Sequence, residues 1–198
     1  DGETHQGNFD LSYLSMMPGM TVMAPKNDWE LEAMLEAAVN GDGPYAIRYP
    51  KGTACTEFQQ FQAPILRGKA EILSKGKKAA ILAVGSMVSV CQDAVKLLKE
   101  QGIEPTFVNA RFVKPLDTAL LDELAEDHQL FVTVEENVKS GGFGEHVCAY
   151  MEACHPGCRV IPIAIWDRFV PHGSIDSLRC KVGLSAAEIA QTVETGIS

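Results

Sequence analysis

Apolar residues recur along the chain with two spacings, which predict strands and helices in turn. Residues 79–84 are apolar without a break, as is typical of a strand buried on both faces of a parallel sheet. Elsewhere apolar residues return every three or four positions, as they do on the buried face of a helix. We predict strands at 21–24, 45–49, 69–73, 79–84, 106–109, 130–134 and 159–165, and helices at 27–39, 87–101, 117–127, 143–153 and 185–195.

Polar residues at the starts of two helices support these boundaries. Asn27 is followed three positions later by Glu30, and Ser185 by Glu188, which is the spacing of a capping box. An apolar residue on each side of the second box completes the pattern of a hydrophobic staple. Both helices are therefore predicted to begin at these polar residues.

The alternation of strands and helices predicts an α/β sandwich around a mainly parallel sheet. Residues 20–50 form a β-α-β unit, which cannot cover both faces of its sheet alone. The stretch 53–64 carries Thr, Gln, Phe and Pro without a clear period, and we interpret it as a linker. The chain is accordingly divided into a first piece at 1–52, the linker, and a second domain at 65–198.

Length and charge limit the classes of function. The chain has 198 residues, of which 46% are hydrophobic, and this is enough for a real core. A net charge of −9 argues against nucleic acid or an anionic membrane as a partner. No apolar run approaches the roughly 18 residues that a membrane span needs.

The six cysteines do not predict a metal site. Cys148, Cys154 and Cys158 lie close together with His155, but no pair repeats the two- to four-residue spacing of zinc ligands. Cys91 and Cys148 fall on apolar helical positions and are interpreted as small core residues. We expect free or buried thiols in a reducing compartment.

The opening loop, residues 1–10, is the first candidate for chemistry. It places Asp1 four residues before His5 and puts glycines on both sides of the histidine. Histidine transfers protons most easily near neutral pH, and a nearby carboxylate can orient it or share a ligand. On these residues alone, a solvated turn remains the more common alternative.

Three other places carry weaker signals. The Gly85-Ser86 turn precedes a helix and could bind an anion there, although a plain turn is the favoured interpretation. The Glu135-Glu136 pair ends a strand and could serve acid–base chemistry or a cation, but packing or a subunit contact is favoured. His172 is interpreted as a hydrogen-bonded histidine between domains, and the remaining histidines as structural.

The opening loop is one of several blocks that resemble a single enzyme family, the 1-deoxy-D-xylulose-5-phosphate synthases of the transketolase superfamily. The blocks are DGxTHQGxFDLSYL (1–14), AIRYPKG (46–52), NARFVKPLD (109–117), EENVKSGGFG (135–144) and DRFVPHG (167–173). They cover nearly the whole chain. The resemblance implies a fragment, the C-terminal third of a longer enzyme, with part of the pyrimidine-binding domain followed by a transketolase C-terminal domain.

The resemblance also implies roles for site residues. His5 and Asp1 fall on the pair that contacts the hydroxyl and carbonyl oxygens of glyceraldehyde 3-phosphate. A donor imidazole there would stabilise the alkoxide that forms when the aldehyde is attacked. Lys51 and Arg48 would bind the phosphate, although the family more often has arginine at position 51, and lysine lacks the bidentate fork.

By the same resemblance, the reaction joins pyruvate to glyceraldehyde 3-phosphate with loss of carbon dioxide, on the route to isoprenoid precursors, thiamine and pyridoxal phosphate. Thiamine diphosphate and Mg2+ would be bound mainly by residues upstream of this chain, so the isolated chain is expected to be inactive. A homodimer is expected, in the cytoplasm of a bacterium or in a plastid if the source is a plant.

Two alternatives stay open. The chain could belong to another member of the superfamily, such as a transketolase or the β chain of a 2-keto-acid dehydrogenase. It could instead be a non-catalytic module for oligomerisation or regulation.

Overall fold

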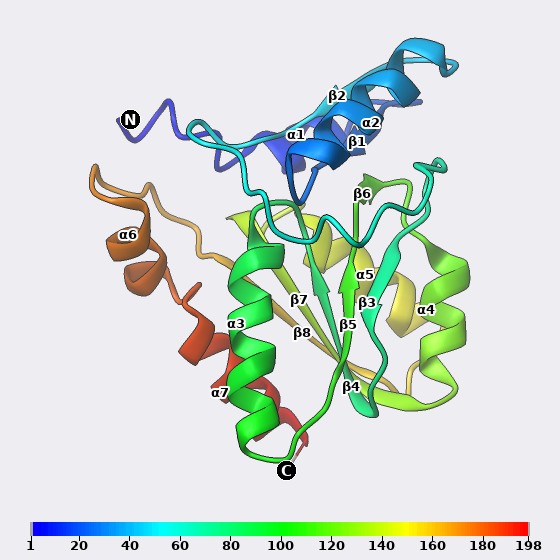
Figure 1. Cartoon of the computed structure of the whole chain (residues 1–198), viewed down its shortest axis with the longest axis vertical. Coiled ribbons are helices and arrows are strands. Elements are labelled where there is room, and N and C mark those ends of the chain that lie inside the picture. The colour runs from blue at the N-terminus through cyan, green and yellow to red at the C-terminus, as the bar shows by residue number, and fades with distance from the viewer. Residues whose placement is uncertain (1, 198) are drawn as a thin grey trace.

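The computed structural model describes residues 2–197 and forms an α/β fold with a small N-terminal layer above a larger domain (Figure 1). The strands are β1 (Thr21–Met23), β2 (Tyr45–Ile47), β3 (Glu71–Ser74), β4 (Lys78–Ala83), β5 (Thr106–Asn109), β6 (Phe112–Lys114), β7 (His128–Val138) and β8 (Arg159–Ile165). The helices are α1 (Asp10–Ser15), α2 (Asp28–Asn40), α3 (Met87–Glu100), α4 (Thr118–Ala125), α5 (Phe143–Cys154), α6 (Ile175–Val182) and α7 (Ala186–Ile197).

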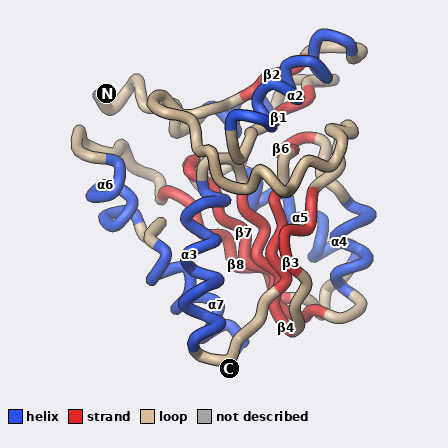
Figure 2. The backbone as a smooth tube through the Cα atoms, in the orientation of Figure 1, coloured by secondary structure: helices blue, strands red, loops and turns tan. Residues whose placement is uncertain are grey.

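The larger domain is built on a five-stranded sheet in the order β3-β5-β4-β7-β8 (Figure 2). β4 pairs in parallel with β5 and β7, and β7 with β8, whereas β3 is antiparallel at one edge. The predicted mainly parallel sheet is therefore confirmed. The apolar stretch that predicted a strand buried on both faces is β4, at the centre of the sheet.

Alternate residues of β4 enter two separate cores. Ile81 packs with buried residues of α3 and α7 on one face of the sheet. Leu82 packs with buried residues of α4 and α5 on the other face. Because side chains point alternately to the two faces of a strand, a central strand covered by helices on both sides must be apolar throughout.

The N-terminal layer is joined to the larger domain by a strand that we did not predict. β1 pairs in parallel with β2, as expected, but its other neighbour is β6, which lies after β5 in the sequence and pairs antiparallel. Arg111 has a φ of 57°, a left-handed conformation between β5 and β6. β6 follows β5 after only two residues, so no loop signal in the sequence separates the two strands.

The predicted capping box at Ser185 and Glu188 is confirmed. At Asn27 and Glu30 the helix cap is confirmed, but the predicted return contact of the Glu30 side chain is wrong. Ser185 and Glu188 exchange hydrogen bonds, from Ser185 N to Glu188 Oε2 and from Glu188 N to Ser185 Oγ. Asn27 Oδ1 accepts from Glu30 N over 3.0 Å and caps α2 as predicted. However, the carboxylate of Glu30 turns inward, where Lys26 is one of its partners.

α1 and α6 were also missed, because α1 has only six residues and α6 leaves most of its residues exposed. Among the described residues, no helix is both long enough and apolar enough to span a membrane. All six cysteines are free thiols in the structure. Cys91 is buried in the core as predicted, but Cys148 is only half-buried.

Candidate functional site

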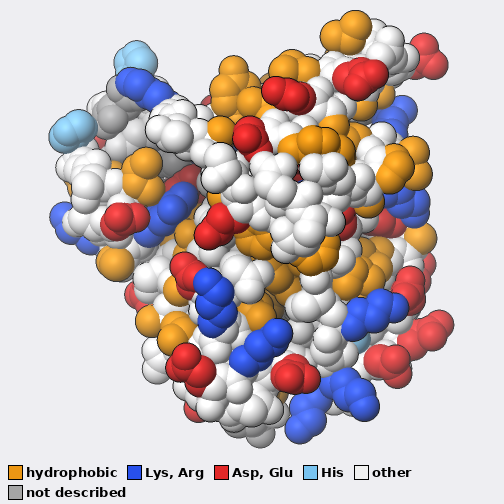
Figure 3. Space-filling view, viewed as in Figure 1, with side chains coloured by type: hydrophobic (Ala, Val, Ile, Leu, Met, Phe, Trp, Pro, Cys, Tyr) orange, Lys and Arg blue, Asp and Glu red, His pale blue; other side chains and the backbone are white. Residues whose placement is uncertain are grey.

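A cavity of about 660 Å³ opens between the N-terminal layer and the larger domain. It lies beside the carboxyl ends of β7 and β8, where open parallel sheets usually bind ligands. The molecular surface is hollowed on the left of Figure 3, where both basic and acidic side chains lie near the N-terminal segment and α6. Its wall is made by His5, Gln6, Gly7, Asn8, Asp10, Ile47, Arg48, Tyr49, Pro50, Lys51, Gly52, Glu136, Ile165, Val170, Gly173, Ile175, Leu178, Arg179, Val182 and Leu184.

The structure brings three of the four predicted site residues to this one cavity. His5, Arg48 and Lys51 all line it, although Arg48 and Lys51 lie more than forty positions after His5 in the sequence. Asp1, the fourth, lies outside the described residues. The imidazole of His5 is exposed, and its Nδ1 lies 3.0 Å from Thr4 Oγ1.

The loop that carries His5 is fixed to the end of β7. The carbonyl oxygen of Asn8 accepts from Val138 N over 2.7 Å, and Asn137 Oδ1 accepts from Leu11 N over 3.2 Å. Gly7 has a φ of 69°, and a Cβ there would lie 2.8 Å from Asp10 Oδ2. A side chain at this position would therefore strain the loop and collide with the carboxylate.

Glu136, at the end of β7, joins the two halves of the cavity. Its Oε1 accepts from Arg179 Nε of α6 over 3.0 Å, and its Oε2 accepts from Ser86 Oγ over 2.9 Å. Arg48 approaches the same Oε2 at 3.7 Å and donates to the carbonyl oxygen of Glu136 over 3.3 Å. Burial raises the pKa of the Glu136 carboxyl, but the two guanidiniums outweigh it and hold that pKa below its usual value.

Comparison with known proteins identifies the family to which this chain belongs. Residues 68–189 match the transketolase C-terminal domain, and residues 1–56 match the transketolase pyrimidine-binding domain. The chain belongs to the transketolase family.

Its curated relatives within the transketolases are named 1-deoxy-D-xylulose-5-phosphate synthase. The relative from Lachnoclostridium phytofermentans is 48% identical over 194 residues, and the one from Dictyoglomus thermophilum is 45% identical over 195 residues. Each comparison covers 98% of this chain and 31% of the relative. The chain is thus homologous to the C-terminal region of these synthases and spans about a third of their length.

A solved structure supports the same assignment of fold. A split-gene transketolase, described as an inactive beta4 tetramer, matches with a TM-score of 0.92 and 28% sequence identity. The match covers 99% of this chain and 64% of that chain. Both the larger domain and the N-terminal layer therefore have the transketolase arrangement.

Within this transketolase domain, the two carboxylates of the Glu135-Glu136 pair do different things. Glu135 is fully buried and caps α5, because its two oxygens accept from Phe143 N over 2.9 Å and Gly144 N over 2.8 Å. Burial raises its pKa to about 7, against the opposing effect of these two hydrogen bonds. Neighbouring residues on a strand face opposite sides of the sheet, and this rule could have separated the pair from sequence alone.

The remaining candidates have structural surroundings. Ser86 lies in the turn that was interpreted as a plain turn rather than an anion site, and its Oγ donates to Glu136 Oε2. His128 is buried between Thr106 Oγ1 and the carbonyl oxygen of Leu124, which confirms its structural interpretation. His172 is exposed on the segment before α6.

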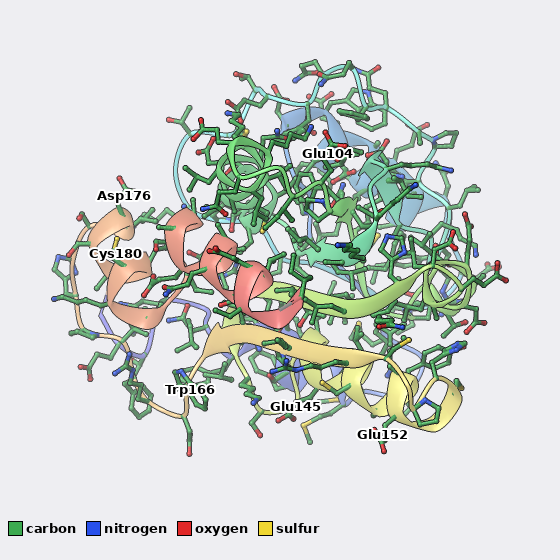
Figure 4. The ribbon with its side chains drawn as sticks, turned by 90° about the horizontal axis from the view of Figure 1, so that it is seen from below. Glu104, Glu145, Glu152, Trp166, Asp176 and Cys180 are labelled. Carbon is green, nitrogen blue, oxygen red and sulfur yellow. The ribbon has the colours of Figure 1, made fainter. Side chains whose placement is uncertain are left out.

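Arg179 was missed because no motif marks it. It lies on α6, of whose residues only Val182 is buried, and its contact with Glu136 joins positions 43 residues apart. Figure 4 shows α6, marked by Asp176 and Cys180, at the side of the domain.

The residues of this chain do not fit the metal of the transketolase cofactor. The synthases use thiamine diphosphate, which the resemblance pairs with Mg2+. In residues 2–197, no group of three or more His, Cys, Asp or Glu side chains is arranged to hold a metal ion. The cavity wall carries three cations, Arg48, Lys51 and Arg179, and two carboxylates, Asp10 and Glu136.

Proposed function

We propose that this chain forms the acceptor wall of a 1-deoxy-D-xylulose-5-phosphate synthase, which joins pyruvate to glyceraldehyde 3-phosphate with release of carbon dioxide. The observation that carries the proposal is the meeting of His5, Arg48 and Lys51 on one cavity. Relatives at 45–48% identity that bear this name support the choice of reaction.

In this proposal the groups on the wall bind the two ends of the acceptor. The cofactor, when bound, supplies the carbon nucleophile that forms from pyruvate. His5 donates a hydrogen bond to the aldehyde oxygen, which becomes an alkoxide as the new carbon–carbon bond forms. Asp1 contacts a hydroxyl of the acceptor, while Arg48 and Lys51 bind its phosphate.

We further infer that the isolated chain is inactive. Its described residues hold no cluster of three or more His, Cys, Asp or Glu side chains that could bind a metal ion, so we assign the binding of magnesium and diphosphate to other parts of the complete enzyme. A similar chain, that of the split-gene transketolase, is described as an inactive tetramer of one chain type, which supports this inference. The family homodimer is proposed for the complete enzyme.

The test is an assay of the complete enzyme that contains this sequence, with pyruvate and glyceraldehyde 3-phosphate. We expect 1-deoxy-D-xylulose 5-phosphate and carbon dioxide, and a His5→Ala variant whose kcat falls by about 100-fold or more. His155→Ala is the matched control, because that imidazole binds Asp122 outside the cavity. Unchanged kcat in His5→Ala would contradict the assigned role.

The same assay separates the alternatives. A transketolase would transfer a two-carbon ketol unit from a sugar phosphate and would not consume pyruvate. For the isolated chain, we expect no turnover and no magnesium-dependent heat of thiamine diphosphate binding in calorimetry. Tight binding by the isolated chain would refute its inferred inactivity.

A further inference from the structure

We propose that Arg179 binds the anionic end of the acceptor. Glu136 holds the guanidiniums of both Arg179 and Arg48 in position for this binding. The inference rests on the proposed function and deepens it. It gives the larger domain a direct part in selecting a phosphorylated acceptor. Its two residues, Glu136 and Arg179, have no role in the proposed function above.

The geometry places two guanidiniums on one carboxylate at the cavity wall. Arg179 comes from α6 of the larger domain, and Arg48 follows β2 of the N-terminal layer. The side chains of Arg48, Glu136 and Arg179 are 13%, 17% and 19% exposed, so the cluster is largely screened from water but still borders the cavity. Glu136 therefore fixes the separation between two cations that belong to different parts of the fold.

The charge of the wall favours an anion. Its acidic and basic side chains are three cations (Arg48, Lys51 and Arg179) and two carboxylates (Asp10 and Glu136), in a protein with a net charge of −9. A single carboxylate cannot neutralise both guanidiniums that it holds, so the cluster keeps a net positive charge. Three cations against two carboxylates leave the wall with a net charge of +1, and a cleft with a net positive charge concentrates anions.

The way in which Arg179 is held suits a phosphate. Within the described part of the chain, its hydrogen bond to Glu136 leaves from Nε, at the inner side of the guanidinium. The two terminal nitrogens form the fork that grips a pair of phosphate oxygens. Because the side chain is already ordered by Glu136, less conformational entropy is lost when the ligand binds.

A simple latch for α6 is the competing explanation, and the packing argues against it. Val182 is buried at the end of α6, and Leu184 is fully buried just after it. Leu184 N also donates to the carbonyl oxygen of Arg179 over 2.9 Å, across Gly183 with a φ of 80°. The hydrogen bond caps the helix, and the burial of Val182 and Leu184 docks its C-terminal end on the domain without the Arg179 guanidinium.

The test compares glyceraldehyde 3-phosphate with unphosphorylated glyceraldehyde as acceptors for the complete, cofactor-loaded enzyme. The variants are Arg179→Ala, Arg179→Lys, Glu136→Gln and the matched control Lys181→Ala, which removes an exposed cation from the same helix but outside the cavity. Calorimetry with glycerol 3-phosphate, and with glycerol as the neutral control, gives a readout that is independent of catalysis.

We expect Arg179→Ala to raise KM for glyceraldehyde 3-phosphate about tenfold or more, with kcat and the KM for glyceraldehyde changed less than about twofold. Affinity for glycerol 3-phosphate should fall by a similar factor. Arg179→Lys should recover part of the loss, Glu136→Gln should show a smaller loss of the same kind, and Lys181→Ala should show none.

Two results would overturn the inference. Equal losses with both acceptors would mean that Arg179 only holds α6, and unchanged values in Arg179→Ala would mean that it does not touch the acceptor. If the wild-type enzyme makes no product from pyruvate but binds glycerol 3-phosphate through Arg179, the proposed function fails and the inference stands.

Discussion

Arg111 donates from Nε to Glu30 Oε1 over 2.7 Å, and both side chains are buried. This bond joins the start of β6 to the first turn of α2 and belongs to a network of buried ion pairs. Lys26 Nζ lies 2.9 Å from both Glu30 and Glu71, and Arg111 Nη2 lies 3.0 Å from Glu71. Two cations and two carboxylates are thereby paired in the space between the N-terminal layer and the larger domain.

We expect loss of one member of this network to be strongly destabilising. Glu30→Ala leaves two buried cations with one carboxylate, and an uncompensated buried charge typically costs about 3–5 kcal/mol. Urea denaturation should show this decrease in the free energy of unfolding. The matched control is Asp93→Ala, which breaks an exposed ion pair with Lys96 and should change stability by less than about 1 kcal/mol. Similar decreases in the two variants would show that the network contributes nothing special.

The network also shows where sequence reasoning stops. A run such as residues 79–84 predicts its own strand, because burial on both faces requires apolar residues at every position. Nothing local indicates that Glu30, which is placed three residues after a helix cap, turns inward to meet Arg111. That contact spans 81 positions and exists only once the two layers are packed.

The candidate site divides in the same way. His5, Arg48 and Lys51 were found because their blocks resemble a family, and the structure brings them to one cavity. Arg179 lies on a mostly exposed helix without a motif, so its approach to Glu136 is a tertiary relationship that no local pattern predicts. Sequence reasoning therefore named candidates on both sides of the cavity, among them Glu136, but missed Arg179.

Close packing at the start of α5 leads to a second prediction. A Cβ on Gly144 would lie 2.6 Å from Thr133 Oγ1 and 2.7 Å from Pro162 Cβ, and all three residues are held by the sheet or the helix. Gly144→Ala should therefore lower the free energy of unfolding by about 1–3 kcal/mol, as overpacking usually does. Gly157→Ala is the control, because a Cβ there meets nothing within 4 Å. Equal stability of the two variants in urea denaturation would show that the site relaxes freely.

The buried carboxyl of Glu135 predicts a pH dependence of stability. Its pKa is raised from 4.5 to about 7 by burial, with Glu145 as a further, smaller cause. The unfolded chain releases this proton at a lower pH than the folded chain does. The folded state therefore loses stability as pH rises from 4.5 to about 7. The glutamine of Glu135→Gln cannot ionise, so the variant does not lose this stability. As pH rises from about 5 to about 8, its free energy of unfolding relative to that of the wild type should increase by up to about 3 kcal/mol.

Urea denaturation of wild type and variant at several pH values measures this gain. The control is Glu152→Gln, which removes a carboxylate from the outward face of α5 (Figure 4). That variant should keep a constant difference from the wild type across the same range. A constant difference for Glu135→Gln as well would mean that Glu135 titrates in the folded protein as it does in the unfolded chain.

Lys51 allows the proposed phosphate end of the cavity to be tested by a gain of affinity as well as a loss. The resemblance to the synthases implies arginine more often than lysine at this position. A guanidinium can grip two phosphate oxygens, where an ammonium presents a single point of charge. In the complete enzyme, Lys51→Arg should lower KM for glyceraldehyde 3-phosphate by about two- to fivefold, whereas Lys51→Ala should raise it by about tenfold or more. Neither variant should alter KM for unphosphorylated glyceraldehyde. Lys99→Arg, at the exposed end of α3, controls for the substitution itself. Equal changes in KM for the phosphorylated and the unphosphorylated acceptor would contradict a role for Lys51 in binding the phosphate.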